Sequence, residues 1–243
     1  MALVWAGFAA FFVVALAVGL RLVALAGRTG RAPELLIGLG VLGIGPIGFG
    51  LQTGAGLVDD PRTAETLAAA GAVALAVGIW AKLIFNWLVY RRDRRVAQIA
   101  TALLAIGVGA QLLAQPMLGS FLAAARNVPL SSARNFIQVA ALAWGAAEAL
   151  AYWVRLRKRA RLGLADGVLV NRFLMWGVSA AAAGLGTAIG IAASLATGAQ
   201  VLEMPAILAS SSAFGLVAAI GMWLAFAPPR AYVAWLAAER ATA

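Results

Sequence analysis

The chain has 243 residues, of which 63% are hydrophobic and only 12% are charged, and it contains no His and no Cys. A soluble domain exposes far more polar surface, so this composition predicts a protein that lies in a lipid bilayer. The missing residue types exclude His and Cys ligands for haem, zinc and iron–sulfur clusters, and also thiol nucleophiles and His general bases. With no Walker-type sequence and no embedded carboxylate cluster, we expect no cofactor, no metal site and no catalytic residue.

Seven apolar segments are long enough to cross a bilayer as helices, which takes about 20 residues each. We expect them near residues 3–25, 34–57, 66–90, 96–122, 134–155, 168–196 and 204–227, followed by an interfacial tail over 228–243. No connection is long enough for a soluble domain. The predicted fold class is all-α: one domain, a bundle of seven transmembrane helices.

The first apolar segment has no basic region before it, and the first charge, Arg21, follows it. This pattern favours an uncleaved first span over a signal peptide.

The second predicted span, residues 34–57, is rich in Gly and contains Pro46 near its centre. We expect close helix packing there, with a kink near Pro46.

The net charge of +10 comes mostly from short basic runs between the spans. One side of the predicted bundle carries 14 Lys and Arg residues, and the other side carries three: Arg62, Arg126 and Arg134. This asymmetry places the N-terminus outside and the C-terminus in the cytoplasm. It favours contact with anionic lipids of the cell membrane over nucleic-acid binding, and it leaves the basic loops available to a cytoplasmic protein partner.

Two ionisable side chains lie deep in the predicted spans, Lys82 in the third and Glu148 in the fifth. Their distances along the chain from Arg91 and Arg155 put both roughly 10–13 Å inside the cytoplasmic boundary. Because a charge in hydrocarbon is costly, such residues usually face a partner or a wet cavity. We expect the two to pair or to share one polar pocket. The alternatives are that Lys82 snorkels to the headgroups and that Glu148 is protonated or bonded locally.

Aromatic and amide side chains surround this predicted pair. Asn86 lies one turn after Lys82, and Trp144 and Tyr152 flank Glu148 at four residues on either side. Trp80 and Trp144 either wall an apolar pocket or anchor the helices at the interface. We include these four residues as candidates for ligand binding.

Two glutamines of the fourth span complete the candidate site. Gln111 and Gln115 share a helix face with Gly107 and Gly119 at steps of four residues. Glutamines in lipid need hydrogen-bond partners, so this face is expected to meet protein or water. Packing between helices is the favoured role, and a contribution to the ligand site is the other.

Seven helices with the N-terminus outside resemble, in topology alone, microbial opsins, G-protein-coupled receptors and some sugar transporters. The retinal-linking lysine of the opsins lies in the last span, and residues 204–227 contain no Lys. We expect a receptor-like or sensor-like protein that binds a small apolar or lipid-like ligand within the bundle, without catalysis. The alternative is a secondary transporter of a small solute, or a proton-coupled carrier, with Lys82 and Glu148 as the coupling pair and the Gly-rich second span as the gate.

Overall fold

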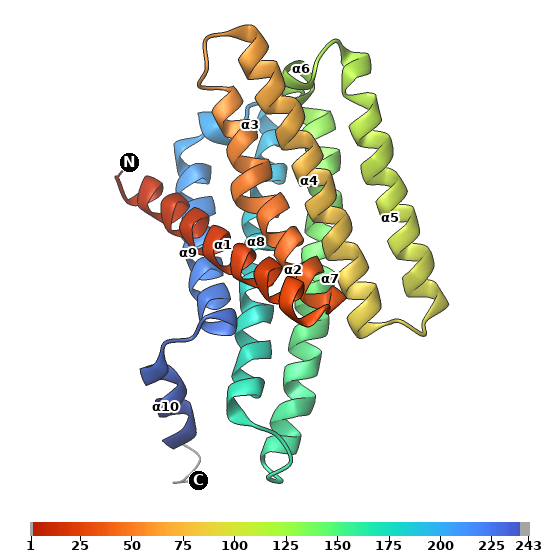
Figure 1. Cartoon of the computed structure of the whole chain (residues 1–243). Coiled ribbons are helices and arrows are strands. Elements are labelled where there is room, and N and C mark those ends of the chain that lie inside the picture. Colours follow the sequence, from red (N-terminus) through yellow and green to blue (C-terminus); the bar gives the residue numbers. More distant parts are fainter. Residues whose placement is uncertain (1, 239–243) are drawn as a thin grey trace.

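The computed structural model describes residues 2–238, and every regular element in this range is a helix (Figure 1). The long single helices are α1 (Ala2–Thr29), α4 (Pro61–Tyr90), α5 (Arg95–Ala114), α7 (Val128–Ala160), α8 (Gly167–Thr197) and α9 (Pro205–Phe226). One continuous rod consists of α2 (Ala32–Leu42), the π-helix η1 (Gly43–Phe49) and α3 (Gly50–Ala55). The short helices are η2 (Pro116–Leu118), α6 (Phe121–Arg126), η3 (Val201–Glu203) and α10 (Arg230–Ala238).

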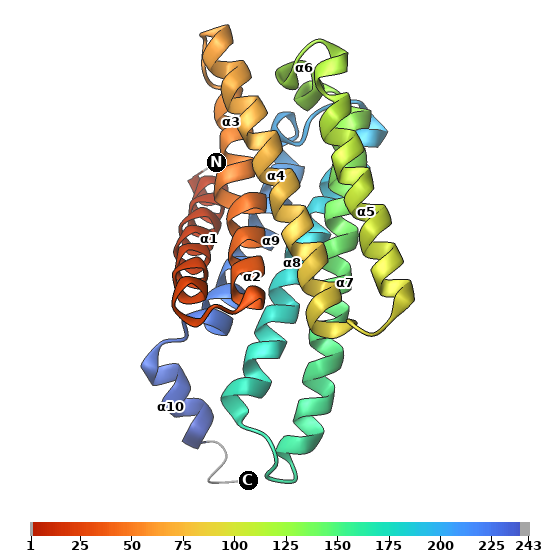
Figure 2. The ribbon, with the colours of Figure 1, turned by 45° about the vertical axis from the view of Figure 1, so that its right-hand side comes forward.

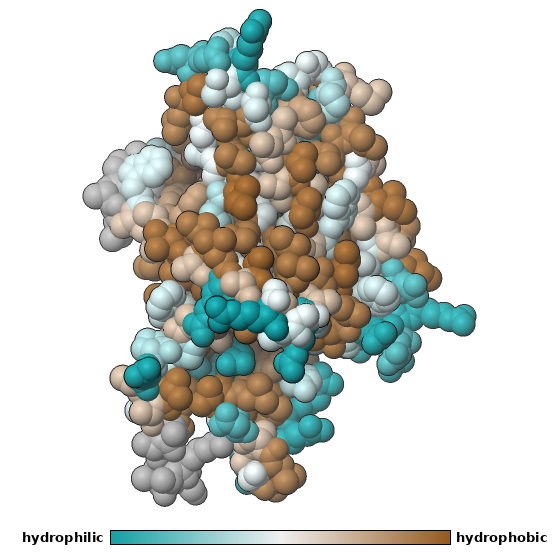
Figure 3. Space-filling model, in the orientation of Figure 1, coloured by the Kyte–Doolittle hydropathy of each residue, from teal (hydrophilic) through white to brown (hydrophobic). Residues whose placement is uncertain are grey.

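Among the described residues, seven helical segments are long and apolar enough to cross a membrane, the α2–α3 rod counting as one. The all-helical architecture and the seven candidate spans confirm this part of the sequence prediction. On the face shown in Figure 3, hydrophobic residues form a broad belt, with hydrophilic residues gathered above and below it. These features are compatible with a multi-pass membrane protein. The main difference lies in the fifth span, because α7 begins at Val128 rather than near residue 134.

The connections between helices lie at two ends of the bundle. One end, which we call the arginine-rich end, carries the connections 30–31, 91–94 and 161–166 together with α10. The opposite end carries the connections 56–60, 115–127 and 198–204. At the arginine-rich end α7 and α8 extend beyond α4 and α5 in both ribbon views (Figures 1 and 2).

The predicted tail forms a helix over part of its length. The hydroxyl of Tyr232 in α10 donates a hydrogen bond to Asn171 Oδ1 of α8 at 3.0 Å, and the rings of Tyr232 and Trp235 stack. This contact attaches α10 to the side of α8. Residues 239–243 of the predicted tail lie outside the described residues.

Six of the seven candidate spans form a ring that follows chain order. α1 packs against the α2–α3 rod, the rod against α4, α4 against α7, α7 against α8, α8 against α9, and α9 back against α1. α5 lies outside this ring, beside α4 (Figure 2). Its apolar side chains Val96, Leu103 and Ile106 are largely exposed, which is compatible with a helix that faces lipid.

The α2–α3 rod approaches α4 so closely that backbone meets backbone. A Cβ atom built on Gly43 would lie 2.5 Å from the carbonyl oxygen of Ala74 and 2.8 Å from Gly78 Cα. A Cβ atom on Gly78 would lie 2.6 Å from the backbone nitrogen of Ile44. The close packing predicted for the Gly-rich span is therefore confirmed here. Pro46, which lacks a backbone N–H, lies within the π-helical turns of η1, and the rod continues through it.

Candidate functional site

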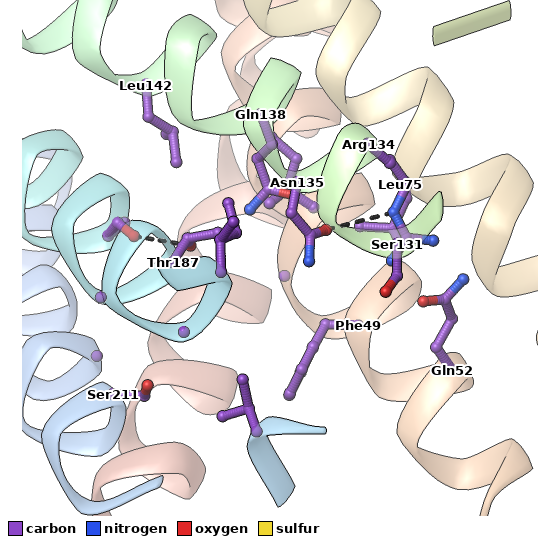
Figure 4. A pocket seen from close by; sticks show the side chains of 18 of the residues that line it. Phe49, Gln52, Leu75, Ser131, Arg134, Asn135, Gln138, Leu142, Thr187 and Ser211 are labelled. Atoms are coloured by element: carbon purple, nitrogen blue, oxygen red, sulfur yellow. Dashed lines mark hydrogen bonds between the residues drawn. The ribbon is translucent and has the colours of Figure 1, made fainter. Parts of the chain in front are cut away.

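The ring of helices surrounds a partly open cavity of about 410 Å³ (Figure 4). Residues from all six ring members line it, and none from α5 does among the described residues. The lining extends from Arg126 and Gln200 at the opposite end of the bundle to Lys82 and Trp176 toward the arginine-rich end. Its volume falls within the range of about 300–1,000 Å³ that is typical of small-ligand pockets.

Most of the cavity wall is apolar. Aromatic and aliphatic side chains come from every ring member: Phe8, Phe11, Ile37, Val41, Ile44, Phe49, Leu75, Leu142, Ile191, Phe214 and Met222. A wall of this kind favours an apolar ligand surface, because burial of apolar area is the main attractive term.

Polar residues interrupt the apolar wall at several places, and we call one group of them the Arg134 cluster. It consists of Ser131, Arg134, Asn135 and Gln138 on α7 together with Gln52 on α3. In Figure 4 the side chains of Arg134 and Ser131 lie on the side of the cavity where Gln52 projects. Arg134 Nε donates to Asn135 Oδ1 at 3.4 Å, and Gln52 Nε2 has no hydrogen-bond partner among the described residues.

The cluster owes its position to the early start of α7. Asn127 Oδ1 accepts a hydrogen bond from Leu130 N at 3.0 Å, which caps the helix, and Pro129 occupies its first turn. Arg134 therefore lies roughly 9 Å inside the helix. It follows Ser131 by three residues and precedes Gln138 by four, so the three share one helix face. Only 6% of Arg134 is exposed.

Lys82 lies toward the arginine-rich end of the cavity and is only 4% exposed. Its Nζ lies 4.1 Å from the ring centroid of Trp176 and 5.5 Å from that of Phe85, positions at which a cation is attracted to an aromatic face. Within residues 2–238, Nζ has neither a hydrogen-bond partner nor an ion pair. Gly145 makes room for it, because a Cβ atom there would lie 2.9 Å from Nζ.

The charge on the cavity lining has one sign. Three basic residues, Lys82, Arg126 and Arg134, belong to the lining, and no Asp or Glu of the described chain does. Arg126 is exposed, whereas the other two are buried and form no ion pair with any described residue. The ring therefore surrounds two buried cations without a carboxylate partner.

Two carboxylates of the opposite end, Glu65 and Asp60, bond to backbone groups outside the cavity. Glu65 accepts hydrogen bonds from the backbone N–H groups of Phe121 and Leu122 at 2.7 and 3.0 Å, which anchors the first turn of α6 to α4. Asp60 caps α4 by accepting from the hydroxyl and the N–H of Thr63, and these bonds lower the pKa of Asp60. Neither carboxylate neutralises the cavity.

Glu148 does not pair with Lys82, and this corrects the direct contact considered from the sequence. Glu148 Oε1 accepts from Arg91 Nε at 2.6 Å and from Trp144 Nε1 at 3.4 Å. Glu148 pairs with Arg91 because Arg91 directly follows α4 and its side chain extends as far as α7. The Lys82 ammonium packs against the ring of Trp176 instead. The hydrogen bond to Glu148 raises the pKa of Arg91 above its usual value.

Glu148 and Trp144 line a second cleft of about 410 Å³, formed by the α4–α5 connection, the start of α5 and α7. Lys82 is not part of this cleft. The structure thus assigns the two embedded charges to separate surfaces rather than to one pocket.

Asn86 and Trp80 bond to neighbouring helices rather than line the central cavity. Asn86 Nδ2 donates to the carbonyl of Ala141 at 2.8 Å, joining α4 to α7. Trp80 Nε1 donates to the carbonyl of Ala105 at 2.9 Å, joining α4 to α5.

The remaining predicted residues also lie away from the cavity. Gln115 Nε2 donates to Gln111 Oε1 at 3.1 Å, so the two glutamines bond to each other within one helical turn, while Gln115 Oε1 is buried without a partner among the described residues. Tyr152 packs against Phe173 with ring centroids 4.6 Å apart, joining α7 to α8. Of the eight residues predicted for the site, Lys82 alone belongs to the cavity lining described above.

Sequence reasoning missed the Arg134 cluster, although a signal for it exists. Asn127 followed by Pro129 is typical of a helix start, with a capping side chain and a proline in the first turn. If the helix is begun there, Arg134 falls nearly two turns inside it instead of at the membrane boundary.

Among residues 2–238, no three carboxylates come together as ligands of a metal ion would. No family model, curated protein or solved structure that was compared with the chain matches it. The cavity, its lining and its charge are therefore the features from which a function can be inferred.

Proposed function

We propose that the protein is a receptor-like or sensor-like multi-pass membrane protein that binds a small, largely apolar ligand in its central cavity. The observation that carries this proposal is the cavity itself, which six candidate spans surround and whose wall is mostly apolar, with buried basic residues at the Arg134 cluster and at Lys82. Binding without catalysis fits the lining, because Ser131 and Ser179 donate to backbone carbonyls and the chain has no His to activate a hydroxyl.

In this proposal the arginine-rich end faces the cytoplasm, in line with the preference of Lys and Arg for that side of the cell membrane. The basic residues near the α7–α8 connection then lie against anionic lipid or a cytoplasmic protein partner. The end of the cavity bounded by Arg126 and Gln200 faces outward. A ligand enters from that side or from the outer leaflet.

A cavity-filling substitution tests the proposal. Ala183 of α8 lines the cavity, and Leu185 of the same helix is 54% exposed. After mild solubilisation of the membranes, we expect native mass spectrometry to find one small molecule per wild-type chain. Ala183→Phe should lose this molecule, and Leu185→Phe should keep it. A wild-type protein without any bound molecule, or equal occupancy of the two variants, would contradict the proposal.

A secondary transporter is the second candidate, and the π-helix η1 favours it. Ile44, Gly45 and Phe49 of η1 line the cavity, and π-helical turns are frequent at functional sites. A transporter has to open its cavity to both sides in turn. Because the chain has no Cys, Ser211→Cys and Ser179→Cys can be labelled without background. Labelling of Ser179→Cys from the arginine-rich side would favour transport, and labelling of both only from the opposite side would favour the receptor-like function.

A further inference from the structure

The polar atoms that line the cavity are biased toward hydrogen-bond donors. Arg134 is a buried cation, and Gln52 Nε2 of the same cluster is a buried N–H group without an acceptor among the described residues. No carboxylate of the described chain lines the cavity. Buried donors and charges without partners are costly, so an arrangement of this kind is suited to an acceptor that arrives with a ligand.

We propose that the Arg134 cluster binds the anionic head of an amphiphile, and that the apolar chain of this molecule lies along the aromatic and aliphatic wall. This inference rests on the proposed function and names its ligand class. A carboxylate head matches the planar fork of a guanidinium, which presents two parallel N–H donors. The free N–H group of Gln52 and the amide of Gln138 supply neutral donors on either side.

The guanidinium of Arg134 is available to an anionic head group because its hydrogen bond within the protein is weak. Its hydrogen bond from Nε to Asn135 Oδ1 measures 3.4 Å, which is longer than a normal bond of this type. Its neighbours in the cluster are hydroxyl and amide groups, which carry no charge. Because only 6% of the residue is exposed, water outside the bundle solvates the guanidinium little.

The wall beside the cluster favours an apolar chain over a small inorganic anion. Figure 4 shows Phe49 and Leu142 on the wall of the same cavity as Arg134. Farther along, the lining continues through Phe214 and Met222 to Trp176. Lys82 lies at that far end with its ammonium packed against the Trp176 ring, so we place the head at Arg134 and the end of the chain toward Lys82.

The charge preference can be read from the rate of thiol labelling in a chain that has no Cys of its own. Ser211→Cys places a thiol in the cavity, on α9. In nanodiscs of phosphatidylcholine we expect an anionic methanethiosulfonate to react several-fold faster than a cationic one, after correction for their rates with a free thiol. Adding Arg134→Gln should abolish this preference. Arg62→Gln, which removes an exposed arginine at the same end, should leave it unchanged.

Protection by defined amphiphiles tests the ligand class. Dodecanoate should slow the labelling of Ser211→Cys at a concentration at least tenfold lower than dodecanol or dodecyltrimethylammonium, which have the same chain. Arg134→Gln should remove this tenfold difference. Arg134→Lys keeps the charge but loses the planar fork of donors, so it should retain part of the difference. This variant also serves if the glutamine variant does not fold.

Nanodiscs that contain phosphatidylglycerol separate the two sources of an anionic head. Protection without dodecanoate indicates a bilayer lipid, and protection only with dodecanoate indicates a free carboxylate.

The outcomes separate this inference from the proposed function. If dodecanol protects as well as dodecanoate, or if Arg134→Gln and Arg134→Lys both leave the protection unchanged, the anionic head is wrong and the apolar cavity still stands. If chloride or sulfate protects fully and no amphiphile does, the site takes a small anion, and the inference is also overturned. If no molecule co-purifies and no amphiphile protects, both proposals fail.

Discussion

Arg91 Nε and Glu148 Oε1 lie 2.6 Å apart and join the end of α4 to α7. The Arg91 side chain is 46% exposed, whereas that of Glu148 is only 9% exposed. α4 is the third ring member in chain order and α7 is the fourth. Their contact therefore joins the N-terminal half of the ring to the C-terminal half. The ion pair stabilises this contact at the C-terminal end of α4, beyond which α7 continues toward the arginine-rich end.

Because its two partners differ in exposure, breaking this pair should have unequal effects. We expect Arg91→Ala to lower the free energy of unfolding more than Glu148→Ala, because it leaves a carboxylate buried without its counter-charge. Since Arg91 is half-exposed, the coupling energy in a double-mutant cycle should be about 1 kcal/mol, near the upper end for exposed pairs. Thermal unfolding of the single and double variants in detergent measures it. Additive effects of the two substitutions would show that the pair contributes nothing.

Lys82 is expected to lower the stability of the fold. Its ammonium is buried without a carboxylate, and the desolvation penalty of several kcal/mol exceeds the roughly 2 kcal/mol gained from a desolvated cation–π contact. Lys82→Met keeps an unbranched side chain, one atom shorter, and removes the charge, so the free energy of unfolding should rise by about 1 kcal/mol or more. Lys158→Met changes the other lysine of the chain, which is exposed, and should have no measurable effect.

A fall in stability for Lys82→Met would mean that a counter-ion or water network inside the cavity stabilises the ammonium. Stabilisation combined with a change in ligand binding would instead indicate that the lysine is retained for function at a cost to the fold.

The helical architecture can be predicted from the sequence because the length of each apolar segment and the basic residues that separate the segments are local properties of the chain. The depth of Lys82 could be inferred in the same way from its distance to the end of its helix. Its partner could not, because pairing depends on which side chains of neighbouring helices reach each other. Arg91, which the sequence places in a loop at the membrane boundary, reaches Glu148 first.

The candidate site was predicted less well than the fold. Asn86, Trp80 and the two glutamines are polar groups in apolar helices, and sequence alone does not say whether such groups bind a ligand or a neighbouring backbone. The structure shows that they bond to carbonyls and to each other. Arg134 was missed because a shift of six residues in the start of one helix moves a side chain from the boundary into the bundle.

The glycine contact between the α2–α3 rod and α4 should be highly sensitive to substitution. A Cβ atom on Gly43 would lie within 2.5 Å of a carbonyl oxygen that cannot move away without shifting α4. We expect Gly43→Ala to lower the free energy of unfolding by about 2–3 kcal/mol through overpacking. A Cβ atom on Gly54 in the same rod would meet nothing within 4 Å, so Gly54→Ala is the matched control. It should be neutral or stabilise by less than about 1 kcal/mol. Equal effects of the two substitutions would show that the backbone approach is looser than the structure indicates.

The orientation of the bundle can be tested with a matched pair of acidic residues at its two ends. Asp59 lies in the connection before α4, Asp93 lies in the connection after it, and both are exposed. In the chain without Cys, Asp59→Cys should react with a membrane-impermeant thiol reagent on intact cells, because the positive-inside rule places its loop outside. Asp93→Cys should react only after permeabilisation. Each substitution removes one negative charge, so neither alters the charge balance more than the other. The reverse labelling pattern would place the arginine-rich end outside, and the entry to the cavity beside Arg126 would then face the cytoplasm.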